Sequence, residues 1–393
     1  MNPSPTRTAD PTPHEVLYPR GGVAVLRRPP ALFGRPAALF YHAFSEGLRR
    51  RRTGRRPAPW EDTTVVAVGN LEMGGNGKTP LAVHLLQFLE RTGQRPVYVS
   101  RGFASTAGRL AAVTVRAAWD GGRCPVRADG LRLLPARGPL GAGDVGDEGA
   151  MVAMRCPGTP LFFSRDKLRA IDLARGMFGP THIILDDAFQ SWRVPRDRDV
   201  VLLDAGRPFG NGRVVPAGTL REPPGALARA DVIGINGCES REAPARYAEA
   251  VRGACGRDVP VFGIERSVVI VDLGKGERGP VAQNVGGGVA ALSSVARPGG
   301  FERSLGPHTG GLALALRYPD HHRYRERDLA DIRHALRERG ITTLVTTDKD
   351  WVKLCGFDLS FTRVLVGRLV LAVDEAVLRE ITKKPQATPA ASS

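Results

Sequence analysis

The sequence predicts an α/β fold: a mostly parallel sheet with helices on both faces, followed by a second, smaller α/β domain. Three observations predict it. From Thr63 onward, short β-branched or apolar runs alternate with stretches of helical periodicity; one run leads through a glycine-rich turn into a helix; and the alternation resumes after Phe262. Crossover helices between parallel strands produce this pattern, because they cover both faces of the sheet.

The first domain is expected to contain short buried strands that alternate with helices. Its predicted strands are Thr64–Val68, Pro96–Ser100, His182–Leu185, Val200–Leu203 and Val232–Ile235, and its clearest helices are Leu81–Leu89 and Lys167–Met177. In the second domain we expect strands at Val289–Val295 and Thr342–Thr346, a helix at Asp328–Arg339 and a connection at Val259–Asp272. The predicted limits are a disordered N-terminus at 1–20, an interfacial helical segment at 21–58, a core domain at 59–258, the linker and second domain at 259–385 and a disordered tail at 386–393.

Composition narrows the class of protein. The chain has 393 residues, 42% apolar and 24% charged, which is enough for two cores and excludes a wholly disordered protein. Its five cysteines include no CxxC pair, so a disulfide scaffold or zinc site is not expected and a reducing cytosol fits best. The net charge of +16 favours an anionic partner, although biased codon usage could also place surplus arginine on the surface. No basic motif is interleaved with aromatic residues, so we expect no nucleic acid partner.

An interrupted apolar stretch, Val23–Leu48, precedes the first strand and is followed by an arginine cluster, Arg49–Arg52 with Arg55 and Arg56. It is too short and polar to span a bilayer, which takes about 20 continuous apolar residues, and no cleavable signal peptide is expected. Its apolar residues recur at helical spacing and suit the membrane interface, where each basic side chain contributes about 1 kcal/mol beside anionic lipid. The alternative is a helix packed on the domain core.

The strongest local motif is a strand, a glycine-rich turn and a helix between Val65 and Pro80. Such a turn lets backbone N–H groups converge on phosphate oxygens, while Lys78 reaches the β- and γ-phosphates and Thr79 can ligate Mg²⁺. The predicted nucleotide-binding residues are Gly74, Gly75, Asn76, Gly77, Lys78, Thr79 and Pro80. One position departs from the GxxxxGK[ST] pattern, because Glu72 stands where the first glycine is expected. The motif makes the first domain P-loop NTPase-like; the alternative is a glycine-rich turn that only closes an α/β unit.

A P-loop needs an acidic site for the metal, and Asp186 and Asp187 follow the strand His182–Leu185. Ligands of open parallel sheets bind at the carboxyl ends of the strands, so we expect these aspartates near the P-loop. One should help hold Mg²⁺ through water while the other orients the site, and the sequence leaves open which does which. Two acids after a strand can also cap a helix.

Two classes of P-loop protein fit poorly. Guanine-nucleotide switches carry an Asn-Lys-x-Asp motif, which Thr347–Asp350 does not supply, and a DxxG switch, which Asp204–Arg207 does not supply. Partitioning ATPases of the deviant Walker type carry a lysine before the paired glycines, where this chain has Met73.

Several separated motifs follow one another in a specific order. They are Val68–Asn70, Gly74–Pro80, Ser100–Phe103, Gly146–Glu148, Leu185–Gln190, Phe209–Arg213, Pro216–Gly218, Leu220–Pro223, Pro319–His322 and Thr347–Asp350. Together the motifs resemble the tetraacyldisaccharide 4'-kinase family of lipid A biosynthesis, over about Pro30 to Val373. The chain departs from the family pattern at four positions: Gly149 for a proline, Ser191 for a histidine, Phe103 for a tyrosine and Ser294 for a glycine.

The resemblance implies a kinase that transfers the γ-phosphoryl group of ATP to the 4'-hydroxyl of a tetraacyldisaccharide 1-phosphate, with Mg²⁺ as cofactor. It also implies Asp147 as the general base and His321 of the second domain as its hydrogen-bond partner, with Lys78 and Asp187 completing the catalytic residues. Locally, Asp147 could instead cap a helix, and His321 with its neighbouring histidine makes a poor metal site, because adjacent side chains project in different directions.

Arg213, Arg221 and Glu222 lie in a Gly- and Pro-rich connection of the kind that carries recognition, and Gln190 follows the paired aspartates. Arginine suits a sugar phosphate because its planar fork donates two parallel hydrogen bonds. We expect these four residues to bind substrate, with Arg213 or Arg221 on the disaccharide or its 1-phosphate.

The expected location is the cytoplasmic face of the bacterial inner membrane, where a monomer would bind peripherally to the anionic surface. An acylated substrate stays in the bilayer, because exposing each CH₂ to water costs about 0.8 kcal/mol. The alternative function is that of a nucleotide-dependent switch protein without lipid kinase activity.

Overall fold

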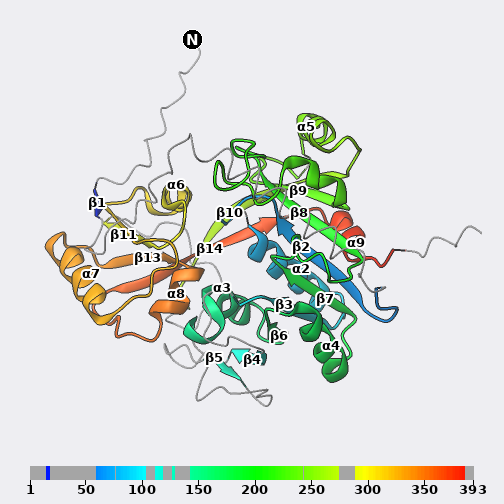
Figure 1. The fold of residues 1–393 in the computed structure, drawn as a ribbon. Helices are drawn as coiled ribbons and strands as arrows, with labels where there is room; N and C mark the ends of the chain where they lie inside the picture. The colour runs from blue at the N-terminus through cyan, green and yellow to red at the C-terminus, as the bar shows by residue number, and fades with distance from the viewer. Residues whose placement is uncertain are drawn as a thin grey trace, which may run out of the picture. The chain divides into compact units, whose positions relative to one another are not determined.

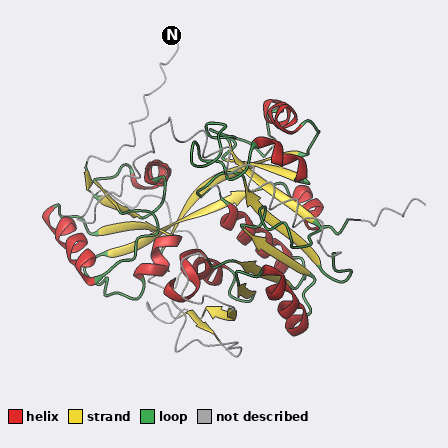
Figure 2. Cartoon of the chain, viewed as in Figure 1, coloured by secondary structure: helices red, strands yellow, loops and turns green. Residues whose placement is uncertain are grey.

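The computed structural model describes residues 15–17, 59–75, 77–102, 111–117, 126–128, 142–241, 243–273 and 288–385. The chain divides into two compact units. The larger, here called the P-loop unit, comprises residues 26–118, 125–266 and 371–393, and the second unit comprises 1–25, 119–124 and 267–370. Figure 1 labels most elements of the two units, and Figure 2 shows their secondary structure.

The sheet of the P-loop unit has the strand order β10-β9-β8-β2-β7-β3-β6-β4-β5. Neighbouring strands from β10 to β6 pair in parallel, and β4 pairs antiparallel with β6 and β5. The strands are β2 Thr64–Asn70, β3 Pro96–Ser100, β4 Ala111–Ala117, β5 Val126–Ala128, β6 Pro160–Phe163, β7 His182–Asp186, β8 Arg198–Asp204, β9 Val232–Asn236 and β10 Val261–Val271. The predicted mostly parallel α/β fold is therefore confirmed.

Helices cover this sheet on both faces. They are α2 Lys78–Arg91, α3 Ala142–Arg155, α4 Lys167–Phe178, the 3₁₀ helix η1 Pro224–Arg229, α5 Ala245–Cys255 and α9 Glu375–Thr382. Val65 and Ala67 of β2 pack with Ile171 of α4 in one apolar cluster, whereas Val66 and Val68, equally buried, point to the opposite face. Burial on both sides explains why β2 reads as a continuous apolar run.

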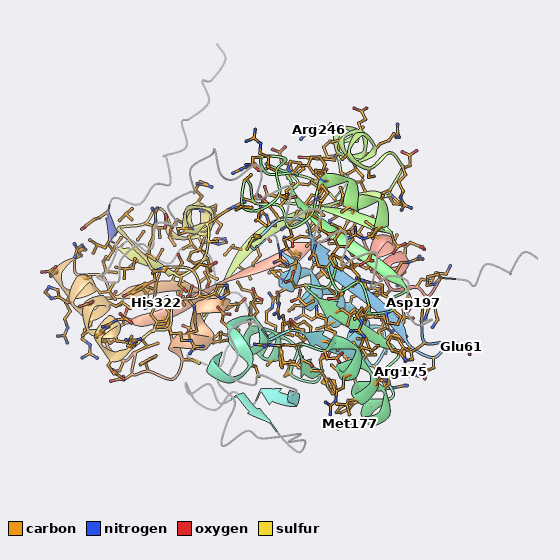
Figure 3. All side chains as sticks on the ribbon, viewed as in Figure 1. Glu61, Arg175, Met177, Asp197, Arg246 and His322 are labelled. Carbon is orange, nitrogen blue, oxygen red and sulfur yellow. The ribbon has the colours of Figure 1, made fainter. Side chains whose placement is uncertain are left out.

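Side chains at the edge of the P-loop unit hold the start of β2 in place. Arg175 of α4 forms an ion pair with Asp62 at 2.7 Å, and its guanidinium lies 5.5 Å from the centre of the Trp60 ring. Figure 3 labels Arg175 near the end of α4, together with Met177, which is partly exposed.

The second unit contains a smaller parallel sheet with the strand order β1-β12-β11-β13-β14. Its elements are β1 Val16–Leu17, β11 Val289–Ser293, α6 Pro298–Thr309, β12 Leu314–Arg317, α7 Glu326–Glu338, β13 Thr343–Thr347, α8 Asp348–Leu354 and β14 Arg363–Ala372. The chain passes from one unit to the other within β10 and returns within β14.

The strands and helices predicted from the sequence are present, with ends shifted by at most three residues. The expected connection at Val259–Asp272 does cross from one unit to the other, and most of it is the strand β10. One segment differs from expectation, because α9 belongs to the P-loop unit rather than to the second domain expected at 259–385. A long-range contact explains this difference: the carbonyl of Thr382 in α9 lies 3.1 Å from Nε2 of His182 in β7.

The N-terminal residues also depart from expectation at one point. Val16–Leu17 forms a strand, although residues 1–20 were expected to be disordered. The strand pairs with Ala315 and Leu316 of β12, and Glu15 forms an ion pair with Arg339 at 2.7 Å. The expected interfacial segment, 21–58, lies outside the described residues, as does the tail at 386–393. No helix in the described part of the chain has the length and apolar character needed to cross a bilayer.

Candidate active site

The turn between β2 and α2 has the backbone of a phosphate-binding loop. Gly74 and Gly77 have φ values of +116° and +83°, which favour glycine. Gly77 precedes the first residue of α2, where free backbone N–H groups and the helix dipole attract anions. A Cβ on Gly77 would lie 2.3 Å from Nδ2 of the buried Asn236, so a larger residue would require that side chain to shift. Pro80 is tolerated because it lies in the first turn, where its N–H is not needed. Gly75 is exposed, and the remaining predicted loop residue, Asn76, lies outside the described residues.

Lys78 is held at this loop by three contacts. Its Nζ donates to Oδ1 of Asn70 and to the carbonyl of Gly74, both at 3.2 Å, and lies 3.6 Å from Oδ1 of Asp187. Asn70 is fully buried at the end of β2. The ammonium group is therefore placed between the loop and the paired aspartates.

Asp186 contacts the first turn of α2, the helix that follows the loop. Its Oδ2 accepts hydrogen bonds from Oγ1 of Thr79 at 2.7 Å and from the hydroxyl of Tyr98 at 2.8 Å. Burial, and then the charge of Asp186, raise the pKa of Tyr98 well above its usual value, so Tyr98 stays a proton donor. Thr79 and Asp186 are oxygen donors of the type that Mg²⁺ prefers. The described residues contain no group of three His, Cys, Asp or Glu that could hold a metal.

Asp187 occupies a different environment. Its φ of +47° is left-handed, and its carboxylate accepts two hydrogen bonds from Nη1 of Arg221 at 2.8 and 2.9 Å. Burial raises the pKa of Asp187, but the charges of Lys78 and Arg221 outweigh it, and the pKa lies below its usual value. The two aspartates thus differ: Asp186 faces the hydroxyl of Thr79, and Asp187 faces cations.

A buried lysine stabilises the backbone of this pair. Lys167, the first residue of α4, is 6% exposed, and its Nζ donates to the carbonyls of Asp186 and Asp187, both at 2.7 Å. Burial lowers the pKa of Lys167 to about 8. By holding both carbonyls, these hydrogen bonds stabilise the left-handed backbone conformation of Asp187.

We expect Lys167→Met to lower the free energy of unfolding by about 2 kcal/mol, because two buried carbonyls lose their donor. Lys167→Arg should retain most of the stability, since it keeps donors at the same place. The measurement is urea unfolding, with the exposed Lys383→Met as the control, which should change stability by less than about 0.5 kcal/mol. Equal stability of Lys167→Met and the wild-type protein would contradict the role given to these bonds.

Three of the four predicted substrate residues lie at the loop: Gln190 follows β7, whereas Arg221 and Glu222 lie on the connection after β8. Gln190 donates from Nε2 to the carbonyl of Asn70 at 3.1 Å and to Glu222 at 3.0 Å. Glu222 is buried and also accepts from Arg229 at 2.8 Å, so its carboxylate supports neighbouring side chains. Arg221 reaches Asp187, whereas Arg213 is exposed on the same connection.

Asp147 lies in the P-loop unit at a break in α3. Gly146 has a φ of +80° and interrupts the helix, and Oδ1 of Asp147 accepts from the backbone N–H of Glu148 at 3.0 Å. A Cβ on Gly149 would lie 2.7 Å from the ring of Phe163, so glycine at this position is matched to the buried aromatic of β6.

His321 lies in the second unit, so its predicted hydrogen bond to Asp147 stays a prediction. Its backbone is left-handed, with a φ of +60°, and its Nε2 lies 3.2 Å from Nζ of Lys349. The neighbouring His322 instead stacks on Tyr318, with ring centres 4.7 Å apart, and its Nε2 lies 3.0 Å from Asp328. The two histidines therefore have separate partners.

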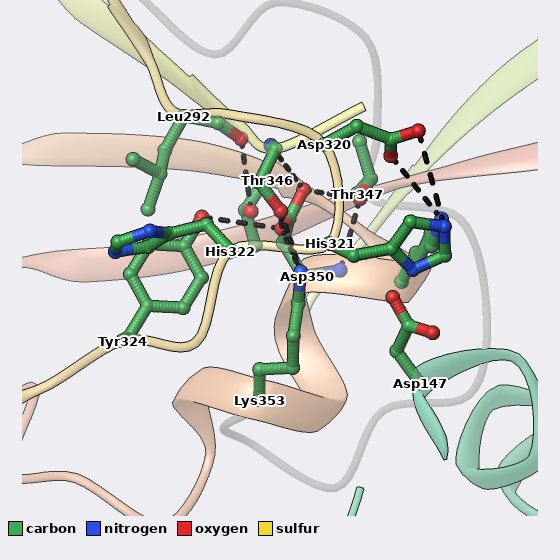
Figure 4. A network of polar contacts seen from close by, with 12 residues as sticks. Asp147, Leu292, Asp320, His321, His322, Tyr324, Thr346, Thr347, Asp350 and Lys353 are labelled. Atoms are coloured by element: carbon green, nitrogen blue, oxygen red, sulfur yellow. Dashed lines mark hydrogen bonds and ion pairs between the residues drawn. The ribbon is translucent and has the colours of Figure 1, made fainter. Parts of the chain in front are cut away.

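A buried carboxylate, Asp350, organises the core beside His321 within the second unit, as Figure 4 shows. It accepts from the backbone N–H of Ser294 at 2.9 Å, from Thr347 at 2.8 Å and from Tyr324 at 3.1 Å, and it pairs with Lys353 at 2.8 Å. The hydroxyl of Ser294 also donates to Asp350, which gives a structural account of serine at this position.

Known proteins resemble this chain in both sequence and fold. A family model described as tetraacyldisaccharide-1-P 4'-kinase matches residues 31–386. The chain belongs to this family. Tetraacyldisaccharide 4'-kinase of Anaeromyxobacter dehalogenans strain 2CP-C is 36% identical over 89% of this chain and 88% of its own length. The enzyme of Geobacter metallireducens is also 36% identical, over 84% of this chain and 88% of its own.

The fold matches a crystal structure of LpxK from Aquifex aeolicus in complex with ATP, with a TM-score of 0.61 over 89% of this chain and 98% of that one. The two sequences are 22% identical, so this likeness shows a shared fold. Within the family fold, sequence reasoning missed Lys167, Tyr98 and the side chain of Asn70. A lysine that opens a helix carries no local signal, because its partners lie 19 and 20 residues further along the chain.

Proposed function

We propose that this protein is an ATP-dependent kinase that phosphorylates the 4'-hydroxyl of a tetraacyldisaccharide 1-phosphate in lipid A biosynthesis. One observation carries the proposal: the phosphate-binding loop, Lys78, Thr79 and the paired aspartates converge at one end of the sheet. Membership of the kinase family supports the choice of acceptor. Incubation with labelled ATP, Mg²⁺ and the disaccharide lipid should place label on the lipid, whereas ATP hydrolysis without lipid labelling would favour a nucleotide-dependent switch.

Phosphoryl transfer requires alignment and neutralisation of charge more than covalent chemistry. The loop amides and Lys78 bind the β- and γ-phosphates, and the ion pair with Arg221 keeps Asp187 charged and oriented. Thr79 and Asp186 are the residues that would hold Mg²⁺, which supplies electrostatic stabilisation of the phosphates when bound. These contacts favour Asp186 as the aspartate that would help hold Mg²⁺. They favour Asp187 as the aspartate that orients the side chains of Lys78 and Arg221.

The sugar hydroxyl is a weak nucleophile, so the proposal includes a general base. We assign this role to Asp147, with His321 as its hydrogen-bond partner. A carboxylate can accept the hydroxyl proton as the oxygen attacks phosphorus, and a partner that donates a hydrogen bond keeps the carboxylate oriented.

Arg213 and Arg221 should affect lipid use differently. Arg213 is exposed, so Arg213→Ala should raise the KM for the lipid about tenfold and leave kcat nearly unchanged, as expected for the loss of one charged hydrogen bond. Arg221→Ala should lower kcat as well, because it releases Asp187. Steady-state kinetics with varied lipid separates the two effects, and the exposed Arg207→Ala is the control. Unchanged KM in an Arg213→Ala/Arg221→Ala double variant would remove both from lipid recognition.

We also propose peripheral binding to the cytoplasmic face of the inner membrane through residues 21–58. Changing all four residues of Arg49–Arg52 to glutamate should abolish binding to vesicles that contain anionic lipid, because each arginine contributes about 1 kcal/mol there. Co-sedimentation measures the bound fraction, and neutral vesicles provide the control. Binding that is equal for the variant and the wild-type protein would defeat the assignment.

A further inference from the structure

Glu72 occupies the first position of the phosphate-binding loop, where the usual pattern has glycine. It is 5% exposed, and its Oε1 accepts a hydrogen bond from Oγ1 of Thr219 at 2.7 Å. Thr219 lies two residues before Arg221 and 147 residues from Glu72. The side chain therefore connects the nucleotide loop to the connection that carries the predicted substrate residues.

Backbone bonds at the same place form a short ladder. The N–H of Met73 donates to the carbonyl of Thr219 at 2.7 Å, and the N–H of Arg221 donates to the carbonyl of Leu71 at 2.6 Å. Glu72 and Leu220 form an antiparallel bridge between these bonds. The position of Arg221 is thus set by pairing with the start of the loop.

A tight turn closes over the Glu72–Thr219 hydrogen bond. Gly210 has a φ of +55°, and a Cβ there would lie 2.6 Å from Oγ1 of Thr219 and 2.8 Å from Oε1 of Glu72. Burying a carboxylate is costly unless it is hydrogen-bonded, and a negative charge repels a bound triphosphate. The hydrogen bond from Thr219 offsets the cost of burying the Glu72 carboxylate. The same bond attaches the phosphate-binding loop to the connection after β8, and this attachment is how Glu72 stabilises the site.

We propose that Glu72 is a positioning residue that, through Thr219, fixes the connection bearing Arg221 to the phosphate-binding loop. Arg221 is thereby held against Asp187. The connection that bears Arg221 keeps a fixed position relative to the phosphate-binding loop. This inference rests on the proposed kinase function for its catalytic consequence, but the structural link can be measured without the lipid.

The kinetic test uses two variants that break the hydrogen bond and two that keep it. Glu72→Leu and Thr219→Val should each lower kcat/KM for the disaccharide lipid about tenfold, as expected for a hydrogen bond to a charged group. Affinity for ATP should change less than about twofold. Glu72→Gln and Thr219→Ser should stay within about twofold of wild type, because an acceptor and a donor remain. If Glu72→Gln were as impaired as Glu72→Leu, charge rather than the hydrogen bond would matter, and the proposal would be overturned.

Hydrogen exchange of the segment 213–222 in the full chain tests the link directly. Exchange should be faster in Glu72→Leu and Thr219→Val than in wild type. Thr159→Val is the matched control: Thr159 donates to Glu90 at 2.5 Å near the other end of α2, so its loss should leave this segment unchanged. Unaltered exchange in both breaking variants would overturn the proposal even if the lipid is phosphorylated. A wild-type protein that fails to label lipid would refute the kinase function while the exchange result still decides the link.

Discussion

Lys78→Met should lower kcat for lipid phosphorylation by about 10³-fold at saturating ATP, because it removes the cation placed between the loop and Asp187. In the proposed mechanism the ammonium group neutralises charge on the phosphoryl group as it leaves ADP, and methionine fills a similar volume without that charge. Single-turnover transfer of labelled phosphate measures the chemical step without the contribution of product release.

The fold of Lys78→Met should be retained, since the side chain is not part of an apolar cluster. Its contacts are the carbonyl of Gly74, the amide of Asn70 and the carboxylate of Asp187. Circular dichroism and urea unfolding provide the control. Turnover within tenfold of wild type would show that the phosphates are neutralised elsewhere, and Arg221 would then be the first residue to examine.

Asp147→Asn should lower kcat by about 10²- to 10⁴-fold, the range typical of a general base, with little change in ATP affinity. Asparagine keeps the size of the side chain and an oxygen that can accept the N–H of Glu148, so the break in α3 should be preserved. What it loses is the ability to take a proton from the sugar hydroxyl. The pH dependence of kcat should lose its acidic limb in the variant.

Asp172→Asn is the control for Asp147→Asn. Asp172 is an exposed carboxylate of α4, and its loss should leave kcat within about twofold of wild type. Near-normal turnover of Asp147→Asn, with ATP binding unchanged, would exclude Asp147 as the base. A tenfold loss in His321→Ala with a shifted pH profile would support His321 as its partner.

The elements that the sequence predicted well have local causes. The strand Thr64–Asn70 reads as an apolar run because it is buried on both faces, and the turn after it reads as a phosphate loop because Gly74 and Gly77 must adopt positive φ. The strand Val16–Leu17 was missed for the opposite reason: two residues are too few for a periodic pattern, and their order comes from pairing with β12.

The residue types and their spacing alone predicted a phosphate-binding loop, a following pair of aspartates and a parallel α/β sheet. Each of these features depends on residues that lie close together in the sequence. Only the tertiary structure decided which aspartate faces Thr79 and which faces Lys78 and Arg221. The same holds for Glu72, which departs from the sequence pattern and finds its partner 147 residues away. The physical reason is that backbone conformation follows from local sterics, whereas side-chain pairing follows from the order of strands in the sheet.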